Sequence, residues 1–320
     1  MLVVYTDAAD LDPGPGIALL VGAGYEVVRL ETQDAEEIAV GAARAAALVV
    51  GYAPIGKDLL ARLPEVEVVS IMATGFEHID LEAAAARGVC VANVGGAAAP
   101  DVAAHALALT LALIRGLPRY LIAAQQQEWF RLPPLVPPRT TELVLGVLGR
   151  GRIGTQIMTM AGNVFGSVQF HDPAPGIDGS ISLPHVLATS DVVVLTLPLT
   201  PATAGLADRG FFEQMKKGSY LVNVSRGGLV NSRDLRAAVE NGKLRGAAVD
   251  VLDQEPPPPD HPLLGHPQIL VTPHTAYLSD RTEKMYATVA AQNVLDWFTG
   301  SEIVNAVNGI TRRMPSAKER

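Results

Sequence analysis

The stretch that decides the fold reads Val144-Leu145-Gly146-Val147-Leu148-Gly149-Arg150-Gly151-Arg152-Ile153-Gly154. An apolar run ends here in the pattern Gly-x-Gly-x-x-Gly, and residues compatible with a helix continue to Phe165. This order predicts a strand, a tight turn and a helix. Gly149 permits the turn, Gly151 lets the backbone approach a pyrophosphate, and Gly154 lets helix and strand pack closely. Because the free N–H groups and positive dipole end of a helix attract anions, the stretch predicts a dinucleotide phosphate site.

A second apolar run, from Ser167 to His171, ends at Asp172, which lies 21 residues after Gly151 (172 − 151). A carboxylate about 20 residues beyond the glycine pattern is typical of the acid that binds the adenosine ribose of NAD. The glycine pattern alone is a weak signal, and the alternative is a glycine-rich turn in another kind of α/β domain. Strand, helix and acid in this order favour a NAD site.

The composition is that of a chain with large buried cores. It has 320 residues, of which 48% are hydrophobic and 18% charged, which is enough for two domains. The net charge is −8 and the basic residues form no cluster, which argues against nucleic acid or an anionic membrane surface as a partner. The one cysteine, Cys90, lies in an apolar run, so we expect a buried thiol and no disulfide.

The N-terminal residues predict no targeting segment. They include acidic residues, and no basic stretch precedes an apolar one, so we expect a cytoplasmic protein without a signal peptide. The most apolar helical stretch, Val102 to Ile114, is interrupted by His105 and is too short to span a bilayer.

Apolar runs alternate with helical patterns along the whole chain. This alternation predicts parallel sheets with helices on both faces. In the first part, the predicted strands are Leu2–Thr6, Tyr25–Leu30, Leu48–Gly51, Val66–Ala73 and Val89–Ala92, and the predicted helices are Ile17–Gly22, Ala35–Ala46, Lys57–Leu63 and Leu81–Arg87. In the second part, the predicted strands are Leu143–Leu148, Val168–His171, Asp191–Leu197, Tyr220–Val224, Gly246–Val251 and Ile269–Thr272, and a long helical pattern from Ser279 to Phe298 follows.

A helix and an arm between the two parts predict self-association. The helix Pro100–Ile114 is apolar nearly all round, so we expect it to be buried or to lie in a subunit interface. Pro118 is expected to break or kink it. The stretch Gln125–Arg139 is polar, then proline-rich, and contains Trp129, which predicts an arm. Packed on a second copy, helix and arm would give a C2 homodimer.

Three further stretches lie where strands should end, and ligands of open α/β sheets bind outside those carboxyl ends. Arg226 follows an apolar strand, and its forked guanidinium suits a carboxylate; the alternative is an ordinary surface arginine. Glu255 precedes four prolines that stiffen its loop; the alternative is a solvated loop acid. His274 follows a strand and a proline, and a carboxylate partner would make it a general acid–base with a raised pKa; a lone histidine is more often structural.

With these residues in view, the chain resembles the D-isomer-specific 2-hydroxyacid dehydrogenase family. Order and spacing agree from about Met72 to Asn308. The matching residues are Gly149-x-Gly151-x-x-Gly154, Asp172-Pro173, Leu197-Pro198-Leu199-Thr200 with Thr203, Asn223 through Gly227, Gly246 to Val251 with Glu255-Pro256, and Thr272-Pro273-His274. The resemblance implies an α/β fold of two Rossmann-like doubly wound parallel-sheet domains. A NAD-binding Rossmann domain, residues 99–280, would be inserted into a flavodoxin-like substrate-binding domain, residues 1–98 and 281–320.

The resemblance also implies a catalytic set. Arg226 would hold the substrate carboxylate and carbonyl, His274 would donate or accept the proton on the C2 oxygen, and Glu255 would orient His274 and raise its pKa. The backbone N–H groups of Thr74-Gly75-Phe76 would hold the carboxylate. Tyr277 follows His274 by three residues, and we expect its ring to wall the pocket against the C3 substituent of the substrate, with Phe76 as an opposite wall.

The cofactor implied is NAD, and no metal is expected. Asp250 would bond the nicotinamide carboxamide and Pro198 would line the adenine side. The full set expected to bind NAD is Val102, Gly149, Gly151, Arg152, Ile153, Gly154, Asp172, Pro198, Thr203, Val224, Ser225, Asp250 and His274.

Three residues depart from the family pattern. Ala104 stands where the family usually has an acid, and His105 follows it. Arg150 could reach a phosphate and, with His171, soften a preference for NADH. Thr74 stands where the related phosphite dehydrogenases have lysine, which disfavours that substrate.

These observations predict a NAD(H)-dependent oxidoreductase that interconverts a small 2-keto acid and its D-2-hydroxy acid, with the glyoxylate/hydroxypyruvate reductases as the expected type. The alternative is a NAD(H)-sensing binding protein of the C-terminal binding protein type, which is similar throughout and retains the same Arg, Glu and His. The lack of long regulatory tails in this chain weakens that alternative. The order Arg226, Glu255, His274 argues against the homocysteine-nucleoside hydrolases, which share a central glycine pattern.

Overall fold

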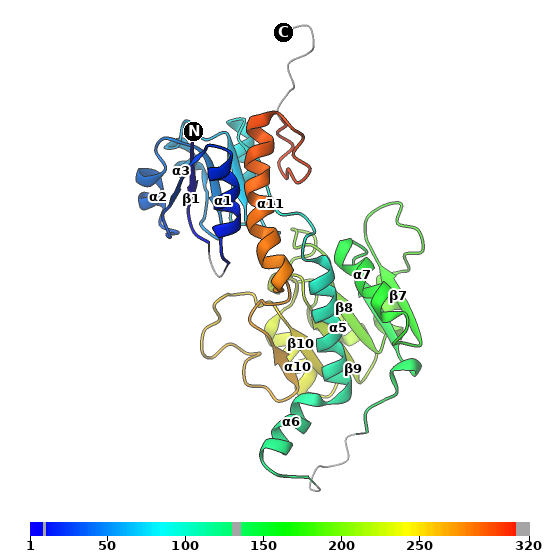
Figure 1. The fold of residues 1–320 in the computed structure, drawn as a ribbon. Helices are drawn as coiled ribbons and strands as arrows, with labels where there is room; N and C mark the ends of the chain where they lie inside the picture. The colour runs from blue at the N-terminus through cyan, green and yellow to red at the C-terminus, as the bar shows by residue number, and fades with distance from the viewer. Residues whose placement is uncertain (9–10, 130–135, 312–320) are drawn as a thin grey trace. The chain divides into compact units, whose positions relative to one another are not determined.

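The computed structural model describes residues 1–8, 11–129 and 136–311 (Figure 1). The chain forms two compact units. Unit 1 comprises Met1–Ala97 and Ser279–Arg320, and unit 2 comprises Ala98–Leu278. Unit 1 thus takes both ends of the chain, and unit 2 is inserted between them.

Unit 1 is built on a five-stranded parallel sheet in the order β2-β1-β3-β4-β5. Its strands are β1 (Leu2–Tyr5), β2 (Glu26–Arg29), β3 (Ala45–Val50), β4 (Val68–Ile71) and β5 (Cys90–Ala92). The inner strands are buried along nearly their whole length, as parallel strands covered on both faces must be. Cys90 is buried and forms no disulfide.

Among the described residues of unit 1, five helices pack around this sheet. They are α1 (Gly14–Gly22), α2 (Ala35–Gly41), α3 (Lys57–Ala61), α4 (Leu81–Ala86) and α11 (Asp280–Thr299). The last helix, α11, packs against α1 and β4, so the C-terminal part of the chain covers part of the first sheet (Figure 1). The predicted helix Ala35–Ala46 is too long, because Ala45 and Ala46 pair in β3; strand pairing overrides the helix preference of alanine here.

Unit 2 is built on a six-stranded parallel sheet in the order β11-β10-β9-β8-β6-β7. Its strands are β6 (Val144–Leu148), β7 (Ser167–His171), β8 (Val192–Leu195), β9 (Ser219–Asn223), β10 (Leu244–Val249) and β11 (Ile269–Val271). The chain runs from β6 outward to β7 and then returns to β8 on the other side of β6. Loops after β6 and β8 diverge at such a point, which is where open α/β sheets bind ligands.

The helices of unit 2 are α5 (Ala99–Arg115), α6 (Leu117–Gln125), α7 (Arg152–Ala161), α8 (Leu183–Thr189), α9 (Arg209–Gln214) and α10 (Ser232–Glu240), with short 3-10 turns at Thr140–Glu142 and Gly227–Leu229. Helix α5 packs against α7, β9 and β10. The two parallel sheets confirm the predicted class of two Rossmann-like, doubly wound α/β domains with one inserted into the other.

The break after α5 differs from the prediction. Gly116 ends α5 in the left-handed conformation (φ 65°), and Pro118 stands in the first turn of a second helix, α6, bent from α5 by 66°. Proline fits a first helical turn because its missing N–H has no partner there in any case. Among the described residues, no single helix is long and apolar enough to cross a membrane; α5 and α6 meet the criterion only as this bent pair.

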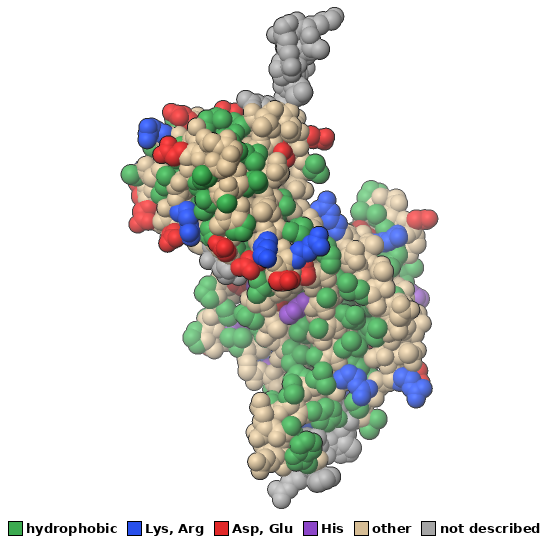
Figure 2. All heavy atoms as spheres, viewed as in Figure 1, with side chains coloured by type: hydrophobic (Ala, Val, Ile, Leu, Met, Phe, Trp, Pro, Cys, Tyr) green, Lys and Arg blue, Asp and Glu red, His purple; other side chains and the backbone are tan. Residues whose placement is uncertain are grey.

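The predicted arm is described only in part. Trp129 is 73% exposed, and residues 130–135 lie outside the described ranges. On the face of unit 2 along which α5 runs, hydrophobic side chains gather with few charged ones among them (Figure 2). The apolar side chains that α5 leaves partly or fully exposed include Ala104, Leu107, Ala108 and Leu111. Their spacing places them on one stripe of the helix.

Candidate active site

The glycine turn between β6 and α7 has the geometry that its sequence predicts. Gly149 has a φ of 103°, which only glycine adopts readily. A Cβ on Gly154 would lie 1.9 Å from the carbonyl oxygen of Gly149, so α7 and the turn touch at that point. A Cβ on Gly151 would meet nothing within 4 Å, so the backbone there faces open space.

The start of α7 suits an anion. Its first helical residues are Arg152, Ile153 and Gly154. The N-cap residue is Gly151, which has no side chain that could accept hydrogen bonds from their N–H groups. An uncapped helix start above a glycine turn presents free donors and a positive dipole end. These features of unit 2 fit the pyrophosphate of a dinucleotide.

Asp172 stands directly after β7, beside the glycine turn. Its Oδ2 accepts a hydrogen bond from the Arg150 N–H at 2.6 Å, and its Oδ1 accepts one from the Ala174 N–H at 2.9 Å. The carboxylate is therefore fixed at the strand end where a ribose is expected.

Two basic residues that could soften the cofactor preference are held by other contacts. The Arg150 guanidinium lies 4.9 Å from the ring centre of Phe170 and donates to the Asp178 carbonyl at 3.0 Å. The His171 ring nitrogen Nδ1 lies 2.8 Å from the Ile181 carbonyl.

Other predicted cofactor residues line the ends of β8 and β9. The Thr203 hydroxyl donates to the Pro198 carbonyl at 2.6 Å and accepts from the Thr200 N–H at 2.8 Å, so it shapes the 198–203 loop. The Ser225 hydroxyl donates to the Leu197 carbonyl. This last contact ties the loop after β9 to the loop after β8. Val102 and Val224 are buried at 8% and 5% exposure, so they can offer at most a small apolar contact.

The loop that carries Arg226 follows β9 and lies against the loop after β10. The side chain of Asn223 holds this loop through two hydrogen bonds. Its Nδ2 donates to the Arg226 carbonyl at 2.9 Å, and its Oδ1 accepts from the Ser225 N–H at 3.1 Å. A Cβ on Gly227 would lie 1.9 Å from the carbonyl carbon of Leu252, so no other residue fits there without movement. The half-buried Arg226 guanidinium donates from Nη1 to the Ser225 carbonyl at 2.8 Å.

Glu255 and His274 form a hydrogen-bonded pair. His274 Nδ1 lies 2.6 Å from Glu255 Oε2, while Glu255 Oε1 accepts from the Leu252 N–H at 2.7 Å. Nδ1 therefore carries the proton toward the carboxylate, and Nε2 is the ring nitrogen left for another group. The two side chains are 38% and 35% exposed, so the pair is accessible to a ligand.

The pKa values of the pair move apart. The hydrogen bond to Glu255 raises the pKa of His274 above its ordinary 6.5 against the lowering effect of burial. The charges of Glu255 and Asp250 also raise it, and Arg226 opposes them. Burial by itself would raise the pKa of Glu255, but the bonds from His274 and Leu252, with the charges of His274 and Arg226, lower it below 4.5. An imidazolium beside a carboxylate and a guanidinium can protonate a carbonyl oxygen next to a bound acid group.

Asp250 is buried against the loop that carries His274. It is only 1% exposed, and both carboxylate oxygens accept hydrogen bonds from the loop 272–276. The structure thus gives this carboxylate a role inside the loop of His274, and its contact with a nicotinamide carboxamide stays a prediction.

The remaining predicted substrate residues lie in both units. Tyr277 belongs to unit 2, and its ring meets that of His274 edge-on, with centroids 6.3 Å apart. Thr74, Gly75 and Phe76 belong to unit 1, where the Thr74 hydroxyl donates to the Gly95 carbonyl at 3.1 Å. Their binding of a substrate carboxylate stays a prediction.

Two residues near His274 received no role from the sequence. His105 on α5 lies 3.1 Å from the Thr272 hydroxyl, which in turn donates to Asp250. The sequence contains only part of the information that would predict this contact. Thr272 stands in the motif before His274, but nothing in the spacing shows that residue 105 meets residue 272.

Among the described residues, no group of three His, Cys, Asp or Glu side chains is arranged to hold a metal ion.

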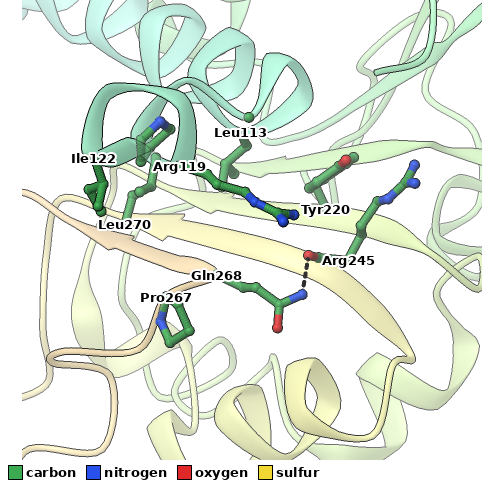
Figure 3. Close-up of a pocket in the computed structure, with 10 residues that line it drawn as sticks. Leu113, Arg119, Ile122, Tyr220, Arg245, Pro267, Gln268 and Leu270 are labelled. Carbon is green, nitrogen blue, oxygen red and sulfur yellow. Dashed lines mark hydrogen bonds between the residues drawn. The ribbon is translucent and has the colours of Figure 1, made fainter. Parts of the chain in front are cut away.

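A hollow of about 400 Å³ lies elsewhere in unit 2, where α5 and α6 meet the starts of three strands (Figure 3). Tyr220 is the second residue of β9 and Gln268 precedes β11, so the hollow is at the amino-terminal edge of the sheet, opposite the strand ends that carry the pair. Its lining consists of Leu113, Gly116, Pro118, Arg119, Ile122, Tyr220, Arg245, Pro267, Gln268 and Leu270. No predicted site residue is among them.

Comparison with known proteins agrees with this geometry. Residues 107–276 match the model of the D-isomer specific 2-hydroxyacid dehydrogenase, NAD binding domain. The glycerate dehydrogenase of Methylorubrum extorquens is 31% identical over 275 residues, which cover 83% of this chain and 86% of that protein. A D-3-phosphoglycerate dehydrogenase of Archaeoglobus fulgidus is 29% identical over 293 residues, 89% of this chain but 55% of that protein. The chain therefore spans about half the length of the phosphoglycerate dehydrogenase it matches.

Solved structures are similar over both units. The TT0316 protein of Thermus thermophilus is 34% identical, with a TM-score of 0.87 over 96% of this chain and 100% of that one. A NADPH-dependent glyoxylate/hydroxypyruvate reductase of Sinorhizobium meliloti, solved with NADP and malonate, is 26% identical, with a TM-score of 0.86 over 98% and 99% of the two chains.

Proposed function

The chain belongs to the D-isomer-specific 2-hydroxyacid dehydrogenase family, and we propose that it interconverts a small 2-keto acid and its D-2-hydroxy acid with NAD(H). The observation that carries this proposal is the 2.6 Å contact between His274 and Glu255, beside the loop of Arg226. A proton donor with a raised pKa next to a guanidinium matches the needs of a 2-keto acid, which has a carboxylate and a carbonyl on adjacent carbons.

Each residue has a distinct task in this proposal. Arg226 binds the carboxylate and the carbonyl oxygen through its forked donors. His274, protonated, gives the Nε2 proton to the oxygen on C2 as reduction proceeds and takes it back in the reverse direction. Glu255 holds Nδ1 and so keeps the ring oriented with Nε2 toward the substrate. A bound nicotinamide supplies the hydride for C2.

For the cofactor, we propose NADH over NADPH. Asp172 ends β7 with its carboxylate fixed by two backbone N–H groups, and a carboxylate binds the ribose hydroxyls but repels a 2′-phosphate. The Sinorhizobium relative is NADPH-dependent, so the preference cannot be taken from the family. Arg150, held on Phe170 and Asp178, is the basic residue nearest to this choice.

For the substrate, we propose the size class of glyoxylate and hydroxypyruvate. The edge-on contact places the Tyr277 ring beside the proton donor, where it would limit the C3 substituent. Replacing Tyr277 with alanine should therefore favour bulkier 2-keto acids. The glycerate and glyoxylate/hydroxypyruvate names of two relatives are consistent with small substrates.

We also propose that the protein is a C2 homodimer. The stripe of Ala104, Leu107, Ala108 and Leu111 leaves apolar surface on α5, and α6 exposes Leu121 and Ile122 at 64% and 54%. Apolar helix faces of this kind are buried when a second copy packs on them.

The test is a screen of NADH oxidation with glyoxylate, hydroxypyruvate, pyruvate and bulkier 2-keto acids. The proposal expects turnover with at least one of the small acids and a D-configured product from hydroxypyruvate or pyruvate. Tight NADH binding without turnover of any of them would instead favour a NAD(H)-sensing binding protein, an alternative that none of the comparisons supports. NADPH, run in parallel, tests the cofactor proposal.

A further inference from the structure

A chain of hydrogen bonds leads from helix α5 to the loop of His274. His105 Nε2 lies 3.1 Å from the Thr272 hydroxyl oxygen, and this hydroxyl donates to Asp250 Oδ1 at 2.6 Å. Because the Thr272 proton is used toward Asp250, the hydroxyl oxygen accepts from His105, whose Nε2 must then carry a proton. His105 Nε2 also lies 3.6 Å from Asp250 Oδ1.

Asp250 transmits this contact to both sides of His274. Its Oδ1 accepts from the Thr275 N–H at 3.0 Å and its Oδ2 from the Ala276 N–H at 2.9 Å. Its backbone carbonyl accepts from the His274 N–H at 2.8 Å. One buried residue thus holds the backbone N–H groups of three consecutive loop residues.

The loop needs such support because His274 has a φ of 54°, in the left-handed region. A residue with a Cβ is disfavoured there and stays only where its surroundings fix it. A shift of this backbone would move the imidazole away from Glu255, and small errors in the position of a reacting group lower rates sharply.

We propose that His105 is a positioning residue, which acts through Thr272 and Asp250 to fix the backbone of the His274 loop. Where it concerns turnover, this inference rests on the proposed function; where it concerns the loop, it stands on geometry alone. The charged and titratable groups that face His274 are Glu255, Asp250 and Arg226, with Tyr277 in edge contact. His105 is 25% exposed at its side chain and approaches this group from α5.

The first experiment measures how well the backbone of the His274 loop is protected from hydrogen exchange, and it does not depend on enzyme activity. Amide hydrogen exchange is followed by mass spectrometry on peptides spanning residues 272–278 in wild type, His105→Phe and Thr272→Val. Each replacement removes one link of the chain and keeps a side chain of similar shape. Loss of one hydrogen bond should speed exchange of the Thr275 and Ala276 amides by roughly five- to tenfold.

Three further variants make this result specific. His105→Gln and Thr272→Ser keep a donor and a hydroxyl, so exchange should return toward the wild-type rate. Thr110→Val is the matched control, because it removes a buried hydroxyl from α5 that donates to the Ala106 carbonyl, within the helix. Unchanged exchange in His105→Phe and Thr272→Val, or equal acceleration in Thr110→Val, would overturn the inference.

The second experiment tests whether replacements of His105 and Thr272 affect turnover independently or through the same chain of hydrogen bonds. With an active keto acid, His105→Phe and Thr272→Val should each lower kcat by about tenfold, with a smaller change in KM. Because they break the same chain, the double variant should lose little more than either single variant. Multiplying losses would show independent packing effects and contradict the inference. If wild type turns over no keto acid, the proposed function fails, and the exchange experiment still decides the role of His105.

Discussion

The contact between His274 Nδ1 and Glu255 Oε2 determines the pH range in which the imidazole is charged. Keto-acid reduction needs the protonated ring, so the rate should be full below the raised pKa of His274 and should fall as pH rises through it. The same pair stabilises the fold in a defined window. The contribution of His274 to the free energy of unfolding is fully present below pH 6.5, the ordinary pKa of histidine. It is lost as pH rises through the raised pKa of His274 in the folded protein. The contribution of Glu255 is fully present above pH 4.5, the ordinary pKa of glutamate. It is lost as pH falls through the lowered pKa of Glu255 in the folded protein.

Replacement of Glu255 by glutamine tests this relation at the level of one side chain. Glu255→Gln removes the charge and the carboxylate acceptor that together raise the pKa of His274. The falling limb of the kcat/KM profile for reduction should therefore move to lower pH. An unmoved limb, with the variant folded, would show that another group controls the profile.

Arg226 offers a second test at this scale. Arg226→Lys keeps the charge but removes the fork, so KM for the keto acid should rise and kcat should fall. Arg233→Lys is the matched control, since Arg233 is exposed on α10. Equal kinetics for Arg226→Lys and Arg233→Lys with every active keto acid would remove Arg226 from substrate binding.

Two glycines of the β6–α7 turn are expected to have different effects when they are replaced. We expect Gly154 to affect the stability of the fold and Gly151 to affect cofactor binding. A Cβ on Gly154 collides with the Gly149 carbonyl, whereas a Cβ on Gly151 enters open space. Gly154→Ala should cost about 1–3 kcal/mol of unfolding free energy, as overpacked sites do. Gly151→Ala should keep the wild-type Tm without cofactor but weaken NADH binding, measured by fluorescence titration. Tight NADH binding by folded Gly151→Ala would place the pyrophosphate elsewhere.

At the end of β7, Asp172 is the residue that we expect to set the preference for NADH over NADPH. Asp172→Asn keeps an acceptor for one of the two backbone N–H groups but removes the negative charge. The ratio of kcat/KM for NADH to that for NADPH should fall by about tenfold, which corresponds to about 1.4 kcal/mol. A ratio equal to that of wild type would show that the carboxylate does not face the ribose.

The sequence predicts most of these elements because their signals are local. Periodicity and glycine spacing locate the strands and the α7 start, and the order of Arg226, Glu255 and His274 on strand ends follows from the parallel sheet. Helix α6 is not predicted, because a proline that opens a helix looks like one that ends it. The enclosure of Asp250 and its link to His105 depend on contacts between residues 105, 250 and 272, which no local pattern records.

At the scale of the molecule, the insertion of unit 2 into unit 1 gathers the pair, Arg226 and the glycine turn into one domain. The exposed stripe on α5 belongs to that same unit, which is where we expect the second copy to pack. Light scattering at micromolar concentration should return the mass of a dimer. Ala108→Glu places a charge in the stripe and should give a monomer, while Val40→Glu, at a 75% exposed site in unit 1, should not. A monomeric wild type would contradict the proposed assembly.

In the proposed reaction, His274 moves the proton as the keto acid is reduced. This role is tested most directly by comparing turnover and NADH binding in wild type and His274→Ala, using the keto acid that wild type reduces fastest. We predict that His274→Ala loses about 10²- to 10⁴-fold in turnover, the usual contribution of a general acid–base, while its affinity for NADH stays near that of wild type. Turnover within a few-fold of wild type would contradict this prediction.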